Sequence, residues 1–163
     1  MAKHWLTMHW PHLKNGTREH GDCGVWLQKG KEAAAEYLKP GDLVFVYETK
    51  TGKPRKDGEE YHHGRQGIVA LARITHIDLK RGFGLSKELY TDGSQTTWKK
   101  VAHTCAIRKR RFCHHDDVCQ SLGYSTNYFF RGFGIERSGL NKLTASEFKQ
   151  ISLHFKPLAA KGP

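Results

Sequence analysis

The sequence has few cysteines, and their spacing excludes the common cysteine-based motifs. Its 163 residues contain four, at Cys23, Cys105, Cys113 and Cys119, and no two of them form a CxxC pair. Zinc knuckles and thioredoxin-like redox sites need that close spacing. The N-terminus has no apolar segment behind a basic start, so we expect no signal peptide, a cytoplasmic location and reduced thiols.

Metal-binding and catalytic signatures are also missing. Cys113 and Cys119 are too far apart for a knuckle, and the adjacent His114 and His115 are poor joint ligands, so we expect no metal and no other cofactor. The chain contains no HNH-like pattern, GxxxxGK[ST] loop, GxSxG or HExxH. We therefore expect a binding module that is not an enzyme by itself. If it serves a nuclease system, we expect the nuclease to be a separate or fused partner.

Long apolar runs are lacking, and acidic residues are scarce. No stretch approaches the roughly 20 residues of a membrane helix, so no membrane partner is expected. The chain has 27 Lys and Arg residues but only 16 Asp and Glu residues, which gives it a net charge of +11. Such an excess favours a nucleic-acid partner, with solubility charge as the alternative. The predicted phosphate contacts are Lys99, Lys100, Arg108, Lys109, Arg110, Arg111, Arg55, Lys56 and Arg65.

What is present indicates a sheet with a few short helices. Alternating or two-faced apolar patterns predict strands at 4–10, 43–47, 67–77 and 98–108, and an aromatic strand at 128–136. Helices are expected at 31–39, at 116–122 and after the capping box that begins at Thr144. Residues 80–97 look irregular. Strands that do not alternate regularly with helices favour an α+β barrel, here one domain over 3–155 with a tail at 156–163.

Several segments together resemble the EVE branch of the PUA-like superfamily. Each is weak alone, but their order and spacing over nearly the whole chain are specific. They are GVW at 24–26, LKPGDLVFVY at 38–47, GIVALA at 67–72, FRGFGI at 130–135 and LTASEF at 143–148.

The resemblance implies an α+β fold, a PUA-like curved mixed β-barrel with flanking short helices, and a pocket for one base. Related YTH domains read methylated adenine in RNA, and SRA domains read methylated cytosine in DNA. EVE-like domains also serve as specificity modules of modification-dependent restriction systems. The GVW segment is similar to that of YTH domains, where its Trp is a wall of an aromatic cage. Trp26 and Trp98 would then be the two walls.

A reader of a flipped base must replace lost stacking and then bind the base edge. Trp26 and Trp98 are the stacking candidates, with Tyr90 and Trp10 in reserve and Tyr47 as a possible pocket floor; each could instead be a core aromatic. The polar candidates for the base edge are Asn15, Thr17, Asp22 and Gln28.

Three functions stay open. The first is recognition of a methylated or hydroxymethylated cytosine, or of N6-methyladenine, with DNA favoured over RNA. The second is an RNA-binding PUA-like protein. The third is an ASCH-like small hydrolase of modified nucleosides, in which Lys31 and Glu32 would form the catalytic pair.

Overall fold

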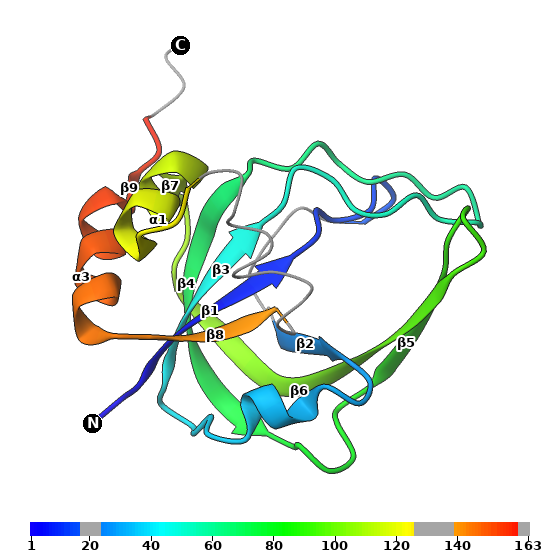
Figure 1. The fold of residues 1–163 in the computed structure, drawn as a ribbon, viewed down its shortest axis with the longest axis horizontal. Helices are drawn as coiled ribbons and strands as arrows, with labels where there is room; N and C mark the ends of the chain where they lie inside the picture. The colour runs from blue at the N-terminus through cyan, green and yellow to red at the C-terminus, as the bar shows by residue number, and fades with distance from the viewer. Residues whose placement is uncertain (17–23, 126–138, 160–163) are drawn as a thin grey trace.

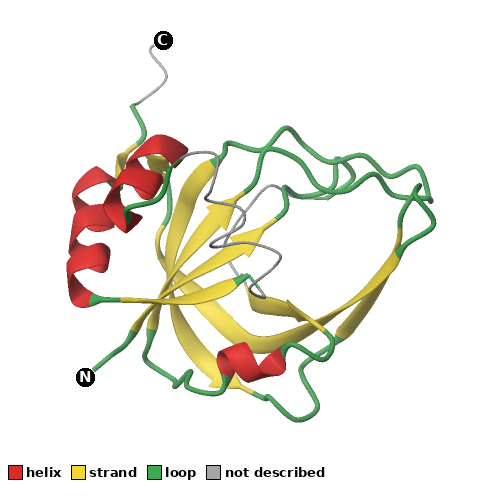
Figure 2. Cartoon of the chain, in the orientation of Figure 1, coloured by secondary structure: helices red, strands yellow, loops and turns green. Residues whose placement is uncertain are grey.

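A strongly curved mixed sheet forms the body of the protein, and two α-helices cover one end of it (Figures 1 and 2). The computed structural model describes residues 1–16, 24–125 and 139–159. The elements are β1 His4–His9, β2 Gly24–Gln28, the 3-10 helix η1 Glu32–Ala35, β3 Leu43–Glu48, β4 Gly67–Ile77, β5 Leu85–Leu89, β6 Gln95–Arg108, β7 Arg111–His114, α1 His115–Leu122, β8 Leu140–Leu143, α3 Ala145–His154 and β9 Lys156–Pro157.

The strands follow the order β2-β6-β4-β3-β1-β8, and β5 pairs with β6 outside this path. Only the β1–β3 pair is parallel among these described pairs. The register shifts in three of them, including twice between β4 and β6. Such bulges bend strands and increase their twist, which lets the sheet curl on itself. The predicted α+β curved mixed barrel with flanking short helices is therefore confirmed.

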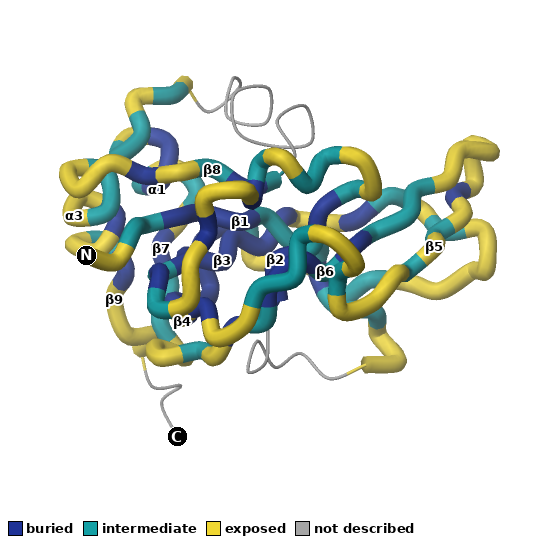
Figure 3. Tube along the Cα trace, turned by 90° about the horizontal axis from the view of Figure 1, so that it is seen from below, coloured by how far each residue is buried: buried dark blue, intermediate teal, exposed yellow. Residues whose placement is uncertain are grey.

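The central strands are those with apolar residues on both faces. Every residue of β3 after Leu43 is buried, and so are the first six residues of β4. One side of the sheet packs Phe45 and Leu71 against the α-helices, and the other packs Val44 and Ile74 under η1. Figure 3 shows this buried chain around β1, β3 and β4, with exposed chain at the far end of β5.

A buried carboxylate joins β1 to the turn before β3. Asp42 accepts hydrogen bonds from the indole Nε1 of Trp5 at 3.0 Å and from the backbone N–H groups of Lys3 and Lys39 at 2.9 and 3.1 Å. Three donors compensate the desolvation of this charge. Asp42 thus fixes the Trp5 side chain in the core.

The predicted C-terminal helix is confirmed as α3. The Thr144 hydroxyl accepts from the backbone N–H of Glu147 at 3.1 Å, and the Glu147 carboxylate accepts from that of Thr144 at 2.7 Å. This capping box satisfies N–H groups that the first helical turn leaves without partners. Ile151 and Phe155 then reach the core, where Phe155 lies edge-on to Phe45.

Three segments differ from expectation. The α-helix predicted at 31–39 is only the single 3-10 turn η1, and its backbone hydrogen bonds join residues three apart. In this tighter turn Ala35 and Leu38 both reach the core before Pro40. The irregular segment 80–97 contains β5, whose alternate residues are half-buried and exposed. Lys156–Pro157 is β9, paired with β7, and not the start of a frayed tail. The strand predicted at 128–136 lies outside the described residues. None of the helices in the described ranges is long and apolar enough to cross a membrane.

Candidate functional site

A pocket of about 330 Å³ is lined by none of the residues of α1 or α3. These two helices cover one end of the sheet (Figure 2), and the pocket opens away from them. Its volume falls within the range of small-molecule sites, roughly 300–1,000 Å³. Aromatic and apolar side chains dominate its lining, and a few polar groups interrupt them. The lining residues are Met8, His9, Trp10, Pro11, His12, Leu13, Trp26, Gln28, Tyr61, Ser86, Glu88, Trp98 and Gly139.

One wall is a continuous face of β2, β6 and β5. Residues directly opposite each other in antiparallel strands point to the same side, as do residues two apart in one strand. Trp98 of β6 lies opposite Gln28 of β2 on one side and Ser86 of β5 on the other. Two residues further along these strands come Trp26 and Glu88. The register of the two strand pairs therefore brings all five side chains to the same face.

The opposite wall comes from the chain after β1 and from the long loop that precedes β4. The backbone N–H of His62 donates to the carbonyl of His12 at 2.7 Å, and Leu13 forms an isolated bridge with Tyr61. These bonds hold Trp10 against the first wall. Its ring meets those of Tyr61, Tyr90 and Trp98 edge-on, at centroid distances of 5.8, 5.7 and 5.6 Å. Edge-to-face contacts of this kind stabilise aromatic clusters.

Glu88 fixes the orientation of the aromatic groups. Its Oε2 accepts from the indole Nε1 of Trp98 at 3.1 Å and from the hydroxyl of Tyr90 at 2.9 Å. Its Oε1 lies 3.0 Å from the guanidinium of Arg55. Burial, with a contribution from the charge of Glu88, raises the pKa of Tyr61 to about 12. The Tyr61 phenol is therefore protonated at neutral pH.

The structure brings together Trp26, Trp98, Trp10 and Gln28, four of the predicted pocket residues, in this lining. Tyr90 is close by but lies behind the wall, where it is 1% exposed. It supports Trp10 and Trp98 and does not face the pocket. The structure thus places the two predicted cage tryptophans on one wall, and their role in binding stays a prediction.

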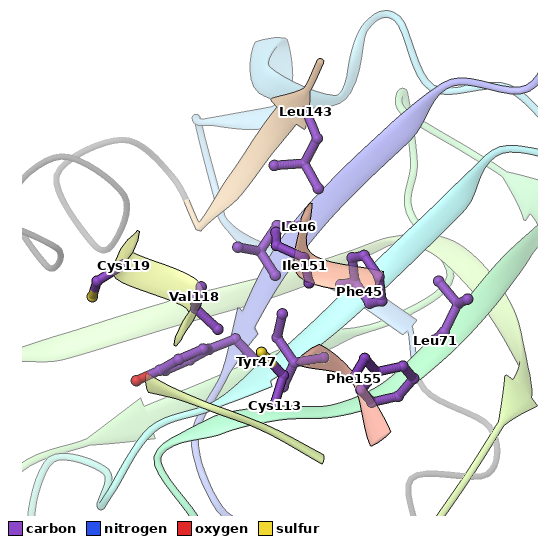
Figure 4. Packing of buried hydrophobic residues seen from close by; sticks show 11 residues of the cluster. Leu6, Phe45, Tyr47, Leu71, Cys113, Val118, Cys119, Leu143, Ile151 and Phe155 are labelled. Atoms are coloured by element: carbon purple, nitrogen blue, oxygen red, sulfur yellow. The ribbon is translucent and has the colours of Figure 1, made fainter. Parts of the chain in front are cut away.

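Three other pocket predictions fare differently. Tyr47 as pocket floor is wrong: it packs in the helix-covered core with Val118 and Cys113 (Figure 4), and its hydroxyl lies 2.9 Å from Nδ1 of His115. The period of two along β3, whose register with β1 is unbroken, puts Tyr47 on the same face as Phe45, and the α-helices cover that face. Asn15 is exposed and does not line the pocket. Asp22 lies outside the described residues, as does the base-edge candidate Thr17.

Sequence reasoning missed several lining residues, chiefly Glu88, Ser86, Tyr61, His9 and His12. The segment 85–89, LSKEL, does carry a period of two, with Ser86 and Glu88 in phase. That signal could have identified a strand with a polar inner face. Tyr61 gave no such signal, because it reaches the pocket through loop pairing alone.

Two of the predicted phosphate contacts are wrong. Lys99 is 5% exposed, and its ammonium donates to the carbonyls of Leu79 and Lys80, both at 2.8 Å, and lies 3.3 Å from Glu32. Arg55 is paired with Asp57 and Glu88. Both cations tie loops to the sheet, since each is surrounded by acceptors of this chain.

The remaining basic candidates do not form a single track. Lys56, Arg65, Arg108, Lys109 and Arg110 are exposed, and Lys100 and Arg111 are half-buried. Arg108 lies ten residues beyond Trp98 in β6, roughly 30 Å along the strand. Arg111 donates to the carbonyl of Phe155. The 108–111 run therefore lies at the helix-covered end, away from the pocket.

Neither a metal centre nor an activated nucleophile is apparent in the part of the chain that is described. No three metal-ligating side chains gather there. Cys119 lies 3.5 Å from Nε2 of His115, but burial and the charge of Asp116 raise the pKa of its thiol to about 11. The Lys31–Glu32 pair does not line the pocket, and Glu32 is engaged by Lys99. This removes the geometric basis of the hydrolase alternative.

Comparison with known proteins gives two solved structures that align with most of this chain. Human THYN1, solved in complex with DNA that contains 5-methylcytosine, has a TM-score of 0.48 and 14% identity over 96% of this chain and all of that one. Rpa0253 from Rhodopseudomonas palustris, solved by NMR, has the same TM-score and identity over 94% and 93% of the two chains. No family model and no curated protein matches the sequence.

The architecture of this chain, described above from its own strand order and helices, is the one that the EVE resemblance implies. At the level of fold the resemblance is thus confirmed.

Proposed function

We propose that this protein is a nucleic-acid-binding module that recognises a modified base by flipping it into the pocket between Trp10, Trp26 and Trp98. One observation carries the proposal. Three tryptophans from separate chain segments converge on one open pocket of about 330 Å³ and are not packed away in the core. Each is half-buried, so each keeps surface for a ligand to cover.

The energetics suit a flipped base. Extrusion costs a few kcal/mol, and base–aromatic stacking returns about 1–3 kcal/mol per base. A methyl group buried between the rings adds about 0.8 kcal/mol, which is roughly a fourfold preference over the unmodified base. The polar groups of the wall must supply any larger selectivity, because a site built to hydrogen-bond its ligand rejects ligands that leave those groups unsatisfied.

The net charge of +11 supports a polyanionic partner. Among the remaining basic candidates, the exposed Lys56 and Arg65 belong to the loop that carries Tyr61, and the half-buried Lys100 lies opposite Trp26 in the β2–β6 pair. These are the phosphate contacts we propose nearest the pocket. Such contacts position the nucleic acid and do not read its sequence.

The ligand we propose is DNA with a methylated or hydroxymethylated cytosine or N6-methyladenine. The use of EVE-like domains in modification-dependent restriction systems favours DNA and suggests a nuclease partner. The protein itself acts as a binder in this proposal, without catalysis of its own. Recognition of RNA is the alternative, and it would depend on contacts to the 2′-hydroxyl.

The test is equilibrium binding at fixed salt to matched oligonucleotides. The panel holds unmodified DNA, DNA with each of the three modifications, and RNA with N6-methyladenine. We expect one modification to bind tighter than its unmodified counterpart, and Trp26→Ala to abolish that margin. Tyr37→Ala is the matched control, since Tyr37 is 65% exposed and does not line the pocket.

Equal, weak binding to every oligonucleotide, unchanged by Trp26→Ala, would contradict the proposal and leave only a nonspecific phosphate surface. Tighter binding to the RNA, with the same sensitivity to Trp26→Ala, would support recognition of a modified base by this pocket but identify RNA as the ligand in place of DNA.

A further inference from the structure

We propose that Glu88 makes the pocket selective for bases that carry an exocyclic amino group, which are cytosine and adenine derivatives, against thymine and uracil derivatives. The inference rests on the proposed function and specifies the ligand class of the same pocket. It comes from the position of one carboxylate in an otherwise aromatic wall.

Glu88 is the only acidic side chain among the described residues that line the pocket. Its side chain is 17% exposed, so it is shielded from bulk water without being sealed off. An ionised carboxylate only accepts hydrogen bonds, whereas the nearby Gln28 and Ser86 both donate and accept. Glu88 is therefore the polar group of this wall that favours a hydrogen-bond donor on the ligand over an acceptor.

The carboxylate is held in one orientation before a ligand arrives. Trp98 and Tyr90 donate to Oε2, and the Arg55 guanidinium lies 3.0 Å from Oε1. A carboxylate offers about four lone-pair sites, and these three donors leave capacity for one more. Arg55 also balances the charge, which makes an ionised group tolerable beside aromatic rings.

The chemistry of the base edges then decides which ligand fits. Cytosine and adenine carry an amino group, a hydrogen-bond donor, where thymine carries a carbonyl oxygen, an acceptor. A methyl group on C5 of cytosine leaves this amino group intact, and one methyl group on N6 of adenine leaves one N–H. A carbonyl directed at Glu88 would oppose two acceptors and leave both without a donor. Hydrogen bonds to charged groups are strong enough for roughly ten- to hundredfold discrimination.

The experiment compares bases that differ at this group. Duplexes carry 5-methylcytosine or thymine opposite an abasic site, so that both bases keep the 5-methyl group and neither must be unpaired. A second pair carries adenine or hypoxanthine. With the wild-type protein we expect each amino base to bind roughly ten- to hundredfold tighter than its carbonyl counterpart.

Glu88→Gln keeps the size of the side chain and one acceptor oxygen but adds an amide donor that suits a carbonyl. We expect the amino-to-carbonyl ratio to fall towards one. Trp26→Phe is the control: it changes a pocket ring but leaves the donors that hold Glu88 in place, so we expect overall affinity to drop while the ratio persists.

The outcomes separate the two proposals. Equal wild-type binding of 5-methylcytosine and thymine, with Trp26→Ala still weakening both, overturns the role of Glu88. It leaves the proposed binding of a flipped base in the aromatic pocket intact. A preserved ratio in Glu88→Gln overturns it as well. Binding that ignores Trp26→Ala altogether overturns both proposals. The wild-type ratio needs no variant, so it decides the question even if Glu88→Gln folds poorly.

Discussion

The two ends of the sheet both gather aromatic residues but use them differently. At the helix-covered end, Phe148 of α3 and Phe155 just after it pack on Phe45 of β3, in one core cluster with Val118 of α1. At the open end, Trp10 and Trp98 are also in ring contact, yet both stay half-buried and line a pocket.

The difference lies in what covers the rings and in their polar atoms. Phenylalanine has no hydrogen-bonding group, so a helix can cover it at no polar cost. The indole of Trp98 and the hydroxyl of Tyr90 need a partner, and Glu88 provides it. A carboxylate at the open end orients the rings, whereas close packing orients them at the covered end. The open end can therefore keep its rings in place while an empty space remains beside them.

The largest effect that would sharpen this comparison is on stability. Phe45→Ala removes a fully buried ring between Phe148 and Phe155, so we expect a loss of about 3–5 kcal/mol in the free energy of unfolding. Trp26→Ala, at the half-buried open end, should cost less. Denaturant unfolding of both variants measures the difference. Equal losses would mean that Trp26 is a core residue like Phe45.

A smaller effect concerns the helix that closes the covered end. Thr144→Ala deletes the N-cap of α3, and we expect it to lower the free energy of unfolding by about 1 kcal/mol. Binding at the open end should not change. Thr144→Ser keeps the hydroxyl and is the control in the same unfolding experiment. A loss of binding in the Ala variant would show that the two ends are coupled.

The smallest effect concerns the reactivity of the cysteine thiols, and its measurement needs no substitution. Burial, with the charge of Asp117, raises the pKa of Cys113 to about 12, and that of Cys119 also rises, while Cys105 is exposed. Of the three cysteines in the described residues, iodoacetamide at pH 8 should alkylate Cys105 first and reach Cys113 and Cys119 only after denaturation, since the thiolate is the nucleophile. Peptide mass mapping resolves each site. Fast native labelling of Cys119 would mean that the helix-covered end opens readily.

The same shifts set a direction for alkaline stability. Both thiols have a higher pKa in the folded than in the unfolded protein. Their contribution to the free energy of unfolding is therefore intact below about pH 9, and it is lost as the pH rises through the folded value, about 11 for Cys119. Melting at pH 7, 9 and 10.5 should show a decline only above pH 9.

The sequence predicts the covered end better than the open end. Apolar runs at 43–47 and 67–77 and the capping box at Thr144 follow local rules, so they could be placed from the chain alone. Trp26 and Trp98 were found through the family resemblance. Glu88 and Tyr61 could not be found in this way, because the pairing of β5 with β6 and of distant loops brings them to the pocket.

Charge was the least reliable guide. Lys99 and Arg55 are cationic, as phosphate-binding residues usually are, but each is paired with acceptors within the chain. Only the three-dimensional partners distinguish a structural cation from a free one. Tyr47 shares the face of Phe45 through the period of two in β3, but only the three-dimensional packing shows that the α-helices cover this face.

The pairing of Ser86 with Trp98 has a consequence for how such a pocket could change its ligand. Because side chains alternate along β5, moving this strand by one residue against β6 would exchange its inner and outer sets. Leu85, Lys87 and Leu89 would then face Trp98, and a donor-bearing cation would stand where the carboxylate does now. One inserted or deleted residue in the hairpin could thus invert the hydrogen-bonding preference of the wall while its tryptophans stay in place.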